Sequence, residues 1–152
     1  MADDADDDAE DGGYDVTDIA RTLPDASRLE FEPPPKTMPT PPIEVAWLTK
    51  IIGPELMLRM VECWGGTLIY IPHEPTRASP LARVIGLNAA QRLGRERGGD
   101  SFVLPLLRWW RVRVENARGL SDRDIARKLV MTEAHVSKML RAATPGGKRK
   151  KG

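Results

Sequence analysis

One stretch near the C-terminus decides the fold: residues 121–141 have the sequence SDRDIARKLVMTEAHVSKMLR. Its apolar residues recur at helical spacing in two runs, which predicts two short helices separated by a break at Val130–Thr132. The residues expected to be buried are Ile125, Ala126 and Leu129 in the first helix and Val136, Met139 and Leu140 in the second. Ala126 would lie where the two helices cross, because only a small side chain fits there.

Capping residues mark where each of these helices begins. Ser121 and Asp124 have the spacing of a capping box, in which the hydroxyl accepts a backbone N–H and the carboxylate accepts another in return. Thr132 is placed as the N-cap of the second helix. Val130 begins the break, where a glycine would permit a positive φ. Since valine resists that conformation, a turn of different geometry is expected.

This pattern is typical of a helix-turn-helix that binds DNA. The outward face of the second helix is polar and suits a major groove. It would carry Glu133, Ala134, Ser137, Lys138 and Arg141. A helical hairpin of the same spacing can instead pack on another protein, but the surrounding basic charge favours DNA as the partner.

Charge is divided unevenly along the chain. Residues 1–44 contain 13 Asp/Glu and 3 Lys/Arg, a net charge of −10, whereas residues 45–152 contain 9 Asp/Glu and 20 Lys/Arg, a net charge of +11. A basic body suits a polyanionic partner. Residues 1–42 are acidic and then proline-rich, so we expect a disordered tail that keeps the chain soluble, screens the DNA-binding face or contacts a protein partner.

Few residues suggest catalysis or metal binding. Cys63 is the only cysteine, and His73 and His135 have no cluster of metal-ligating residues around them. Because no paired carboxylates or nucleophile–base pair stands out, we expect no enzyme activity, no cofactor and no metal. The acidic start differs from a signal peptide and no apolar stretch approaches a membrane span, which predicts a cytoplasmic protein without membrane contact.

An internal repeat occupies the middle of the chain. Residues 48–72 (LTKIIGPELMLRMVECWGGTLIYIP) align without gaps with residues 81–105 (LARVIGLNAAQRLGRERGGDSFVLP), at a constant offset of 33 residues. Each copy predicts a short helix ending at a glycine, a longer helix, a Gly-Gly stop and an extended segment closed by proline. Two strands alone make a weak sheet, so they are expected to pair with each other or across a dimer.

A connecting helix is expected from Pro105 to about Ala117, with Leu107, Trp110, Val114 and Ala117 on one face.

The predicted fold is mainly α with two short β-strands: a duplicated helix–helix–strand unit followed by a C-terminal trihelical helix-turn-helix. The expected domains are a disordered acidic tail at 1–42, a dimerisation region at 43–105, a DNA-binding domain at 106–143 and a flexible basic tail at 144–152.

The element GGTLIYIP, preceded by an apolar helix and followed by a helix-turn-helix, resembles the Mor transcription activator family of phage and prophage regulators. The resemblance covers about residues 44–143, and the tandem arrangement is similar to the longer members. It implies a homodimer that activates phage or prophage genes, and RNA polymerase is a further candidate partner. Roles in the dimer and near the DNA backbone are implied for Gly65, Gly66, Tyr70, Ile71 and Pro72. The second copy has Val103 in place of Tyr70, which leaves open which strand would have this role.

The expected mechanism places two recognition helices in successive major grooves of double-stranded DNA. The best candidates for contacts with base edges are Ser137, Lys138 and Arg141. Lys138 or Arg141 can bind guanine, and Glu133 can accept a hydrogen bond from cytosine N4. Phosphate contacts are expected from Thr132, Arg118, Arg123 and Arg127. The alternatives are a helix-turn-helix repressor, a phage DNA-packaging or DNA-recognition protein, and a protein-interaction module that does not bind DNA.

Overall fold

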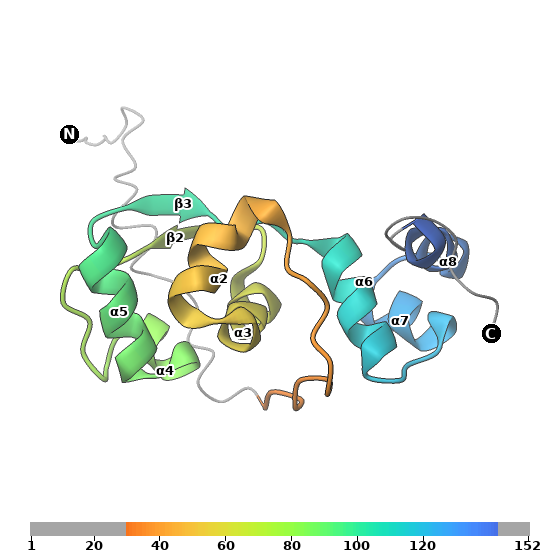
Figure 1. Ribbon diagram of the computed structural model, residues 1–152, viewed down its shortest axis with the longest axis horizontal. Coiled ribbons are helices and arrows are strands. Elements are labelled where there is room, and N and C mark those ends of the chain that lie inside the picture. Colours follow the sequence, from red (N-terminus) through yellow and green to blue (C-terminus); the bar gives the residue numbers. More distant parts are fainter. Residues whose placement is uncertain (1–29, 143–152) are drawn as a thin grey trace, which may run out of the picture. The chain divides into compact units, whose positions relative to one another are not determined.

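The computed structural model describes residues 30–142, a mainly helical chain with one two-stranded antiparallel sheet (Figure 1). Its elements in chain order are the short 3₁₀ helix η2 (Ile43–Val45), α2 (Ala46–Ile52), α3 (Pro54–Trp64), β2 (Leu68–Tyr70), α4 (Pro80–Ile85), α5 (Leu87–Arg97), β3 (Ser101–Val103), α6 (Arg108–Ala117), α7 (Asp122–Leu129) and α8 (Glu133–Ala142). The mainly helical class with two short strands is as predicted.

The described chain divides into two compact units. The first unit contains Ile51–Leu106, and the second contains Phe31–Lys50 together with the chain from Leu107 onward. The boundary predicted between residues 105 and 106 lies one residue from the observed one, but residues 43–50, predicted to belong to the dimerisation region, lie in the second unit. The basic tail expected at 144–152 lies outside the described residues.

In the first unit, glycines set the ends of the helices. Gly53 and Gly86, which precede α3 and α5, share a φ of 90°, a conformation that L side chains rarely adopt. Pro54 occupies the first position of α3, where its missing N–H costs nothing. The apolar stripe of α3 is buried and consists of Met57, Leu58, Met60, Val61 and Trp64.

The two strands pair with each other within the chain, which is one of the two predicted arrangements. Leu68 lies opposite Val103, and Tyr70 lies opposite Ser101. Backbone hydrogen bonds continue the pairing beyond the strands, from Gly66 N–H to Leu104 O at 2.6 Å and from Ile71 N–H to Asp100 O at 3.0 Å. Each strand has three residues, which makes it shorter than the extended segment expected from the sequence.

The loop after β2 lies directly against the C-terminal part of α5. A Cβ placed on Gly94 would lie 2.6 Å from the His73 carbonyl oxygen and 2.9 Å from the Pro72 carbonyl oxygen. Only a residue without a side chain allows this approach, so the glycine inside α5 has a packing role that the sequence pattern does not reveal.

In the second unit, α6, α7 and α8 lie together (Figure 1), and their buried side chains form one apolar core. Its buried members are Val112, Ile125, Ala126, Leu129, Val136 and Leu140. Met139, expected to be buried, is partly buried and packs against this core. All six core side chains are aliphatic, so burial against the other two helices stabilises each of these short helices.

The helix α6 ends at Ala117 as predicted, but its start and its buried face differ from the prediction. It begins at Arg108 instead of Pro105, because Leu107 takes a left-handed conformation with φ 52° and ψ 42°. Ala117, expected on the buried face, is exposed, whereas Val112 and Glu115 are buried.

Residues 31–42 form a strap along the second unit, which corrects the disorder expected over 1–42 for this part of the chain. Pro35 and Pro42 are buried, and the Trp110 indole N–H donates to the Pro39 carbonyl oxygen at 3.1 Å. Arg118 Nε donates to the Pro33 carbonyl oxygen at 3.1 Å. Residues 1–29 of the predicted tail lie outside the described residues.

Candidate nucleic-acid interface

Side-chain caps precede α7 and α8, as predicted, but among the described residues the return bond of a capping box, from the Ser121 N–H to the Asp124 carboxylate, is absent. The Ser121 hydroxyl accepts the backbone N–H of Asp124 at 3.1 Å. The Thr132 hydroxyl accepts the backbone N–H of His135 at 3.1 Å. Each bond satisfies a donor that a helix start leaves without an intrahelical partner, so both helix starts are fixed locally.

The turn between α7 and α8 keeps the geometry that a glycine would give. Val130 has φ 57° and ψ 59°, and the Met131 N–H closes the turn on the Ala126 carbonyl oxygen at 2.8 Å. The expectation of a different turn geometry is therefore wrong. Val130 is 81% exposed, and the left-handed conformation costs a non-glycine residue roughly 1–2 kcal/mol.

The outward face of α8 carries most of the side chains predicted for base contacts. Glu133, Ala134, Lys138 and Arg141 are exposed, as is Thr132 just before the helix. Since Val136 and Leu140 are buried in the core of the unit, the face opposite them is held outward by packing.

Ser137 does not share this exposure, which corrects its predicted role as a base-reading residue. It is half-buried, and its hydroxyl donates to the Asp122 carboxylate at 2.5 Å. This bond joins α8 to the first residue of α7 and so fixes the two helices relative to each other.

Two of the arginines predicted for phosphate contacts are exposed and one is not. Arg123 and Arg127 are exposed on α7. The side chain of Arg118 is only 7% exposed, and it pairs with Glu115 Oε2 at 2.9 Å. Its remaining guanidinium nitrogens donate to the strap, including the Glu32 carbonyl oxygen at 3.3 Å. The prediction that Arg118 contacts phosphate is therefore wrong for this conformation.

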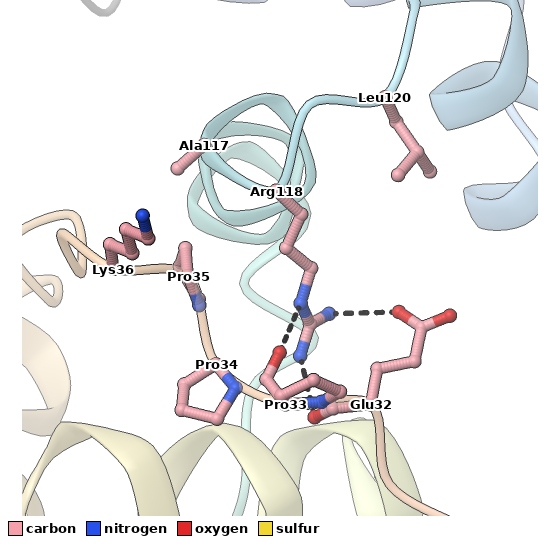
Figure 2. Close-up of a pocket in the computed structure, with 8 residues that line it drawn as sticks. All are labelled: Glu32, Pro33, Pro34, Pro35, Lys36, Ala117, Arg118 and Leu120. Atoms are coloured by element: carbon pink, nitrogen blue, oxygen red, sulfur yellow. Dashed lines mark hydrogen bonds and ion pairs between the residues drawn. The ribbon is translucent and has the colours of Figure 1, made fainter.

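Figure 2 shows Arg118 leaving the end of α6 and pointing into a groove of about 490 Å³ between α6 and the strap. The residues that line this groove are Glu32, Pro33, Pro34, Pro35, Lys36, Ala117, Arg118 and Leu120. The arginine lies against the proline backbone and closes one side of the groove, so its charge is directed inward and away from solvent.

A buried carboxylate organises the charges around Arg118, and sequence reasoning missed it. Glu115 is 0% exposed, and Lys128 Nζ lies 3.0 Å from its Oε1 in an ion pair without hydrogen-bond alignment. Lys128 Nζ also donates to Glu32 Oε1 at 2.7 Å. Two carboxylates and two cations thus balance, as burial of charge requires. The available signal was the i, i+3 spacing of Glu115 and Arg118.

The ion pairs shift the pKa values of two members of this cluster. The hydrogen bond from Lys128 lowers the pKa of Glu32, and it outweighs the opposing effect of partial burial. Burial acts to lower the pKa of Lys128, but its pairing with the carboxylates of Glu32 and Glu115 raises it. Both groups therefore remain charged when the strap is in place.

The strand element singled out by the sequence is engaged in the first unit's own fold. Gly65 ends α3 with its N–H on the Val61 carbonyl oxygen, and Gly66 has φ 89°. Tyr70 is half-buried opposite Ser101, and Pro72 lies against α5 through its carbonyl. Ile71 is 0% exposed, so its side chain is not a surface available to a partner or to DNA.

Cys63 is half-buried, and burial raises the pKa of its thiol to about 11, with the charge of Glu62 adding to the effect. Such a thiol stays protonated near neutral pH.

Within residues 30–142, no group of three or more His, Cys, Asp or Glu could hold a metal ion. A helix with the length and apolarity to cross a membrane is likewise absent from that part of the chain.

Comparison of the chain with models of protein families, with curated proteins and with solved structures finds no match.

Proposed function

We propose that the chain is a sequence-specific DNA-binding transcription regulator in which α7, the turn and α8 form a helix-turn-helix. The observation that carries this proposal is the two-sided nature of α8. One side is packed into a three-helix core, and the other side presents Lys138 and Arg141 to solvent on a helix whose start is capped by Thr132. A short, rigid helix with an exposed polar side is the element that enters a major groove.

The charge of the second unit supports a nucleic acid as the partner. Residues 107–142 contain 9 Lys/Arg and 4 Asp/Glu, a net charge of +5. Arg118 and Lys128 are engaged with carboxylates, whereas Arg123, Arg127, Lys138 and Arg141 are exposed. Cations on both α7 and α8 would allow one helix to hold the phosphate backbone while the other contacts base edges.

Roles follow from chemistry and position. Lys138 and Arg141 donate hydrogen bonds and suit guanine O6 and N7, and Glu133 accepts and suits cytosine N4. Arg123 and Arg127 suit phosphates, where they fix register without reading sequence. Thr132 and Ala134 lie at the N-terminal end of α8, where a groove-binding helix approaches bases most closely.

A finer proposal concerns the first unit, which we infer to be a duplicated helix–helix–strand unit of a dimeric, Mor-like regulator. The backbone supports the duplication: Gly65 and Gly98 have φ values of −55° and −57°, and Gly66 and Gly99 have φ values of 89° and 91°. The Mor-like assignment and the homodimer rest on the sequence resemblance. DNA binding by α8 does not depend on either of them.

The decisive test removes both guanine-reading candidates. Lys138→Ala with Arg141→Ala should weaken specific binding by about 2–5 kcal/mol, or roughly 30- to 4,000-fold, measured by fluorescence anisotropy on a duplex selected from a random pool. The matched control is Lys50→Ala with Arg95→Ala, which removes the same charge from exposed positions on α2 and α5. Equal effects of the two double variants would refute base contact by α8.

A second pair of variants separates phosphate contacts from base contacts. Arg123→Ala with Arg127→Ala should weaken binding to all sequences alike and reduce the slope of log K against log salt by about one per lost contact. The selected sites also test the dimer, because two recognition helices require half-sites about one helical turn apart or a multiple of it.

A further inference from the structure

The N-terminal segment outside the described residues has a charge opposite to that of the candidate interface. Residues 1–29 contain 10 Asp/Glu and 2 Lys/Arg, a net charge of −8. Nine of the acidic residues lie within residues 3–18. Such a run presents closely spaced negative charges, which is the property that basic DNA-binding surfaces recognise without sequence.

The structure fixes the point from which this segment leaves the second unit. The strap begins at Phe31, and Glu32 is attached to α7 through Lys128 Nζ at 2.7 Å. Its carbonyl oxygen and carboxylate are both bound by Arg118 at the end of α6, at 3.3 Å and 3.5 Å. The Arg118 side chain is 93% buried, so this attachment is a built contact and not a passing surface pair.

The target surface consists of the four exposed cations of α7 and α8, which we call the basic face: Arg123, Arg127, Lys138 and Arg141. Within residues 30–142, none of these four side chains has an ion-pair partner. The same two helices also expose the carboxylates of Asp124 and Glu133, so the four cations leave a net charge of +2 there, on the unit to which the strap is attached.

Reach and tethering favour the contact. A segment of 29 residues can extend up to about 100 Å, whereas a ten-residue helix such as α8 is about 15 Å long. Any point on α7 or α8 is within this reach. Tethering also gives the segment an effective concentration in the millimolar range at the unit, so even weak ion pairing is populated at low salt.

We propose that residues 1–29 dock on the basic face and compete there with DNA as an acidic segment of the same chain. This proposal rests on the DNA-binding function proposed above. A face that is free one-tenth of the time binds DNA about tenfold more weakly than a face that is always free. Salt screens the docking, so the competition is strongest at low ionic strength.

The test compares the full chain with two full-length variants. In the neutral-tail variant, every acidic residue of the segment becomes its amide: Asp3, Asp4, Asp6, Asp7, Asp8, Asp11, Asp15, Asp18 and Asp25 become Asn, and Glu10 becomes Gln. In the shuffled variant, residues 3–18 are reordered among themselves, which changes their order but keeps the composition and the density of the acidic run. The shuffled variant should behave as the full chain does, because the proposal depends on charge and not on a specific motif.

The first readout uses no DNA. Backbone amide NMR shifts of α7 and α8 should differ between the full chain and the neutral-tail variant at low salt, with the largest differences around the basic face. They should converge as salt is raised. Differences confined to α3 or α5, or no differences at all, would overturn the docking.

The second readout is affinity for a duplex of arbitrary sequence, where the neutral-tail variant should bind about tenfold more tightly at low salt. Tighter binding without amide shifts on α7 and α8 would reveal a long-range charge effect and would also overturn the docking. If all three chains fail to bind DNA while the amide shifts are present, the docking stands and the DNA-binding function fails. If all three chains bind DNA equally and no amide shifts occur, the docking fails and the DNA-binding function stands.

Discussion

Val130 holds a backbone conformation that its own side chain disfavours, at a fully solvent-facing position in the turn before α8. Val130→Gly removes the Cβ that makes this conformation costly, by roughly 1–2 kcal/mol, but it also frees the unfolded chain at a cost of up to about 1 kcal/mol. We expect the free energy of unfolding to rise by about 0.5–1 kcal/mol. The midpoint of urea denaturation measures the change.

Val130→Ala is the control for this substitution. It removes the β-branch and keeps the Cβ, so it should give a smaller gain than Val130→Gly or none. Both variants should leave the affinity for DNA unchanged, because Val130 offers no hydrogen-bonding group. A lower midpoint for Val130→Gly would mean that the valine side chain contributes more contact than its exposure indicates.

At the residue scale, local interactions could be predicted and distant ones could not. The caps at Ser121 and Thr132 bind N–H groups three residues away, so their partners are visible in the sequence. Arg118 and Lys128 both bind Glu32, which is 86 and 96 residues away. No spacing rule connects residues so far apart. From the sequence alone, the side chains of Arg118 and Lys128 would therefore be assigned to a solvent-exposed face.

The helix α5 carries a glycine that helix propensity alone would replace. Alanine is about 1 kcal/mol better than glycine inside a helix, so Gly94→Ala should be stabilising if only propensity mattered. The added Cβ would lie 2.6 Å from the His73 carbonyl oxygen and 2.9 Å from the Pro72 carbonyl oxygen, and backbone atoms do not move away easily. Since overpacking costs about 1–3 kcal/mol and the propensity gain offsets about 1 kcal/mol of this, we expect the free energy of unfolding to fall by up to about 2 kcal/mol, measured by thermal or urea denaturation.

Gln91→Ala on the same helix provides the comparison. Gln91 is exposed, so its replacement should change the free energy of unfolding by less than about 0.5 kcal/mol. A stabilising effect of Gly94→Ala equal to the propensity difference would show that the loop at His73 shifts freely from α5.

The strap makes the second unit sensitive to acid. The hydrogen bond from Lys128 holds the pKa of Glu32 below its ordinary value of 4.5. Since the folded pKa is lowered, the stabilising contact is complete above the ordinary value and is lost as pH falls through the folded pKa. NMR titration of the Glu32 side chain should give a midpoint below 4.5, and Lys128→Met should return it toward the ordinary value.

An unchanged Glu32 midpoint in Lys128→Met would place the cause of the lowered pKa elsewhere. The charge of Arg118 is the other contributor, and it acts at a longer distance of 3.5 Å. Because Glu32 is more than half exposed, the contact is screened by solvent, and we expect a local titration and not global unfolding.

Among the elements, those with an apolar period were predictable and the strap was not. Apolar periodicity predicts the helices α3, α7 and α8. The Gly-Gly stops mark where the two strands begin and so predict that these strands can pair. Apart from its prolines, the strap has few apolar side chains, and its hydrogen bonds with Trp110 and Arg118 are accepted by the carbonyl oxygens of Pro39 and Pro33. Carbonyl acceptors occur at every residue, so composition gives no sign of them, and prolines lower the entropy lost when such a segment is ordered.

At the scale of the whole molecule, the charges separate more sharply than the net charge of +1 indicates. The described residues 30–142 contain 17 Lys/Arg and 12 Asp/Glu, a net charge of +5, which equals the net charge of residues 107–142 alone. The remainder of the described chain is therefore neutral in sum. Long-range attraction to a polyanion is directed at the unit of α6, α7 and α8.

Amide hydrogen exchange with and without a selected duplex tests this distribution over the whole chain. We expect added protection in α8 and at the start of α7, because these elements carry the exposed cations.

The Mor resemblance also implies contact near the DNA backbone from the strand after Gly66. We expect no added protection at residues 68–71, because Ile71 is 0% exposed and its N–H is already bound to the Asp100 carbonyl oxygen. Protection that appears in β2 but not in α8 would mean that the first unit contacts the DNA. It would refute the role of α8 as the recognition helix. A duplex at 100 times its dissociation constant should raise the free energy of unfolding by about 2.7 kcal/mol, so the protected amides should slow by roughly 100-fold if they exchange through unfolding.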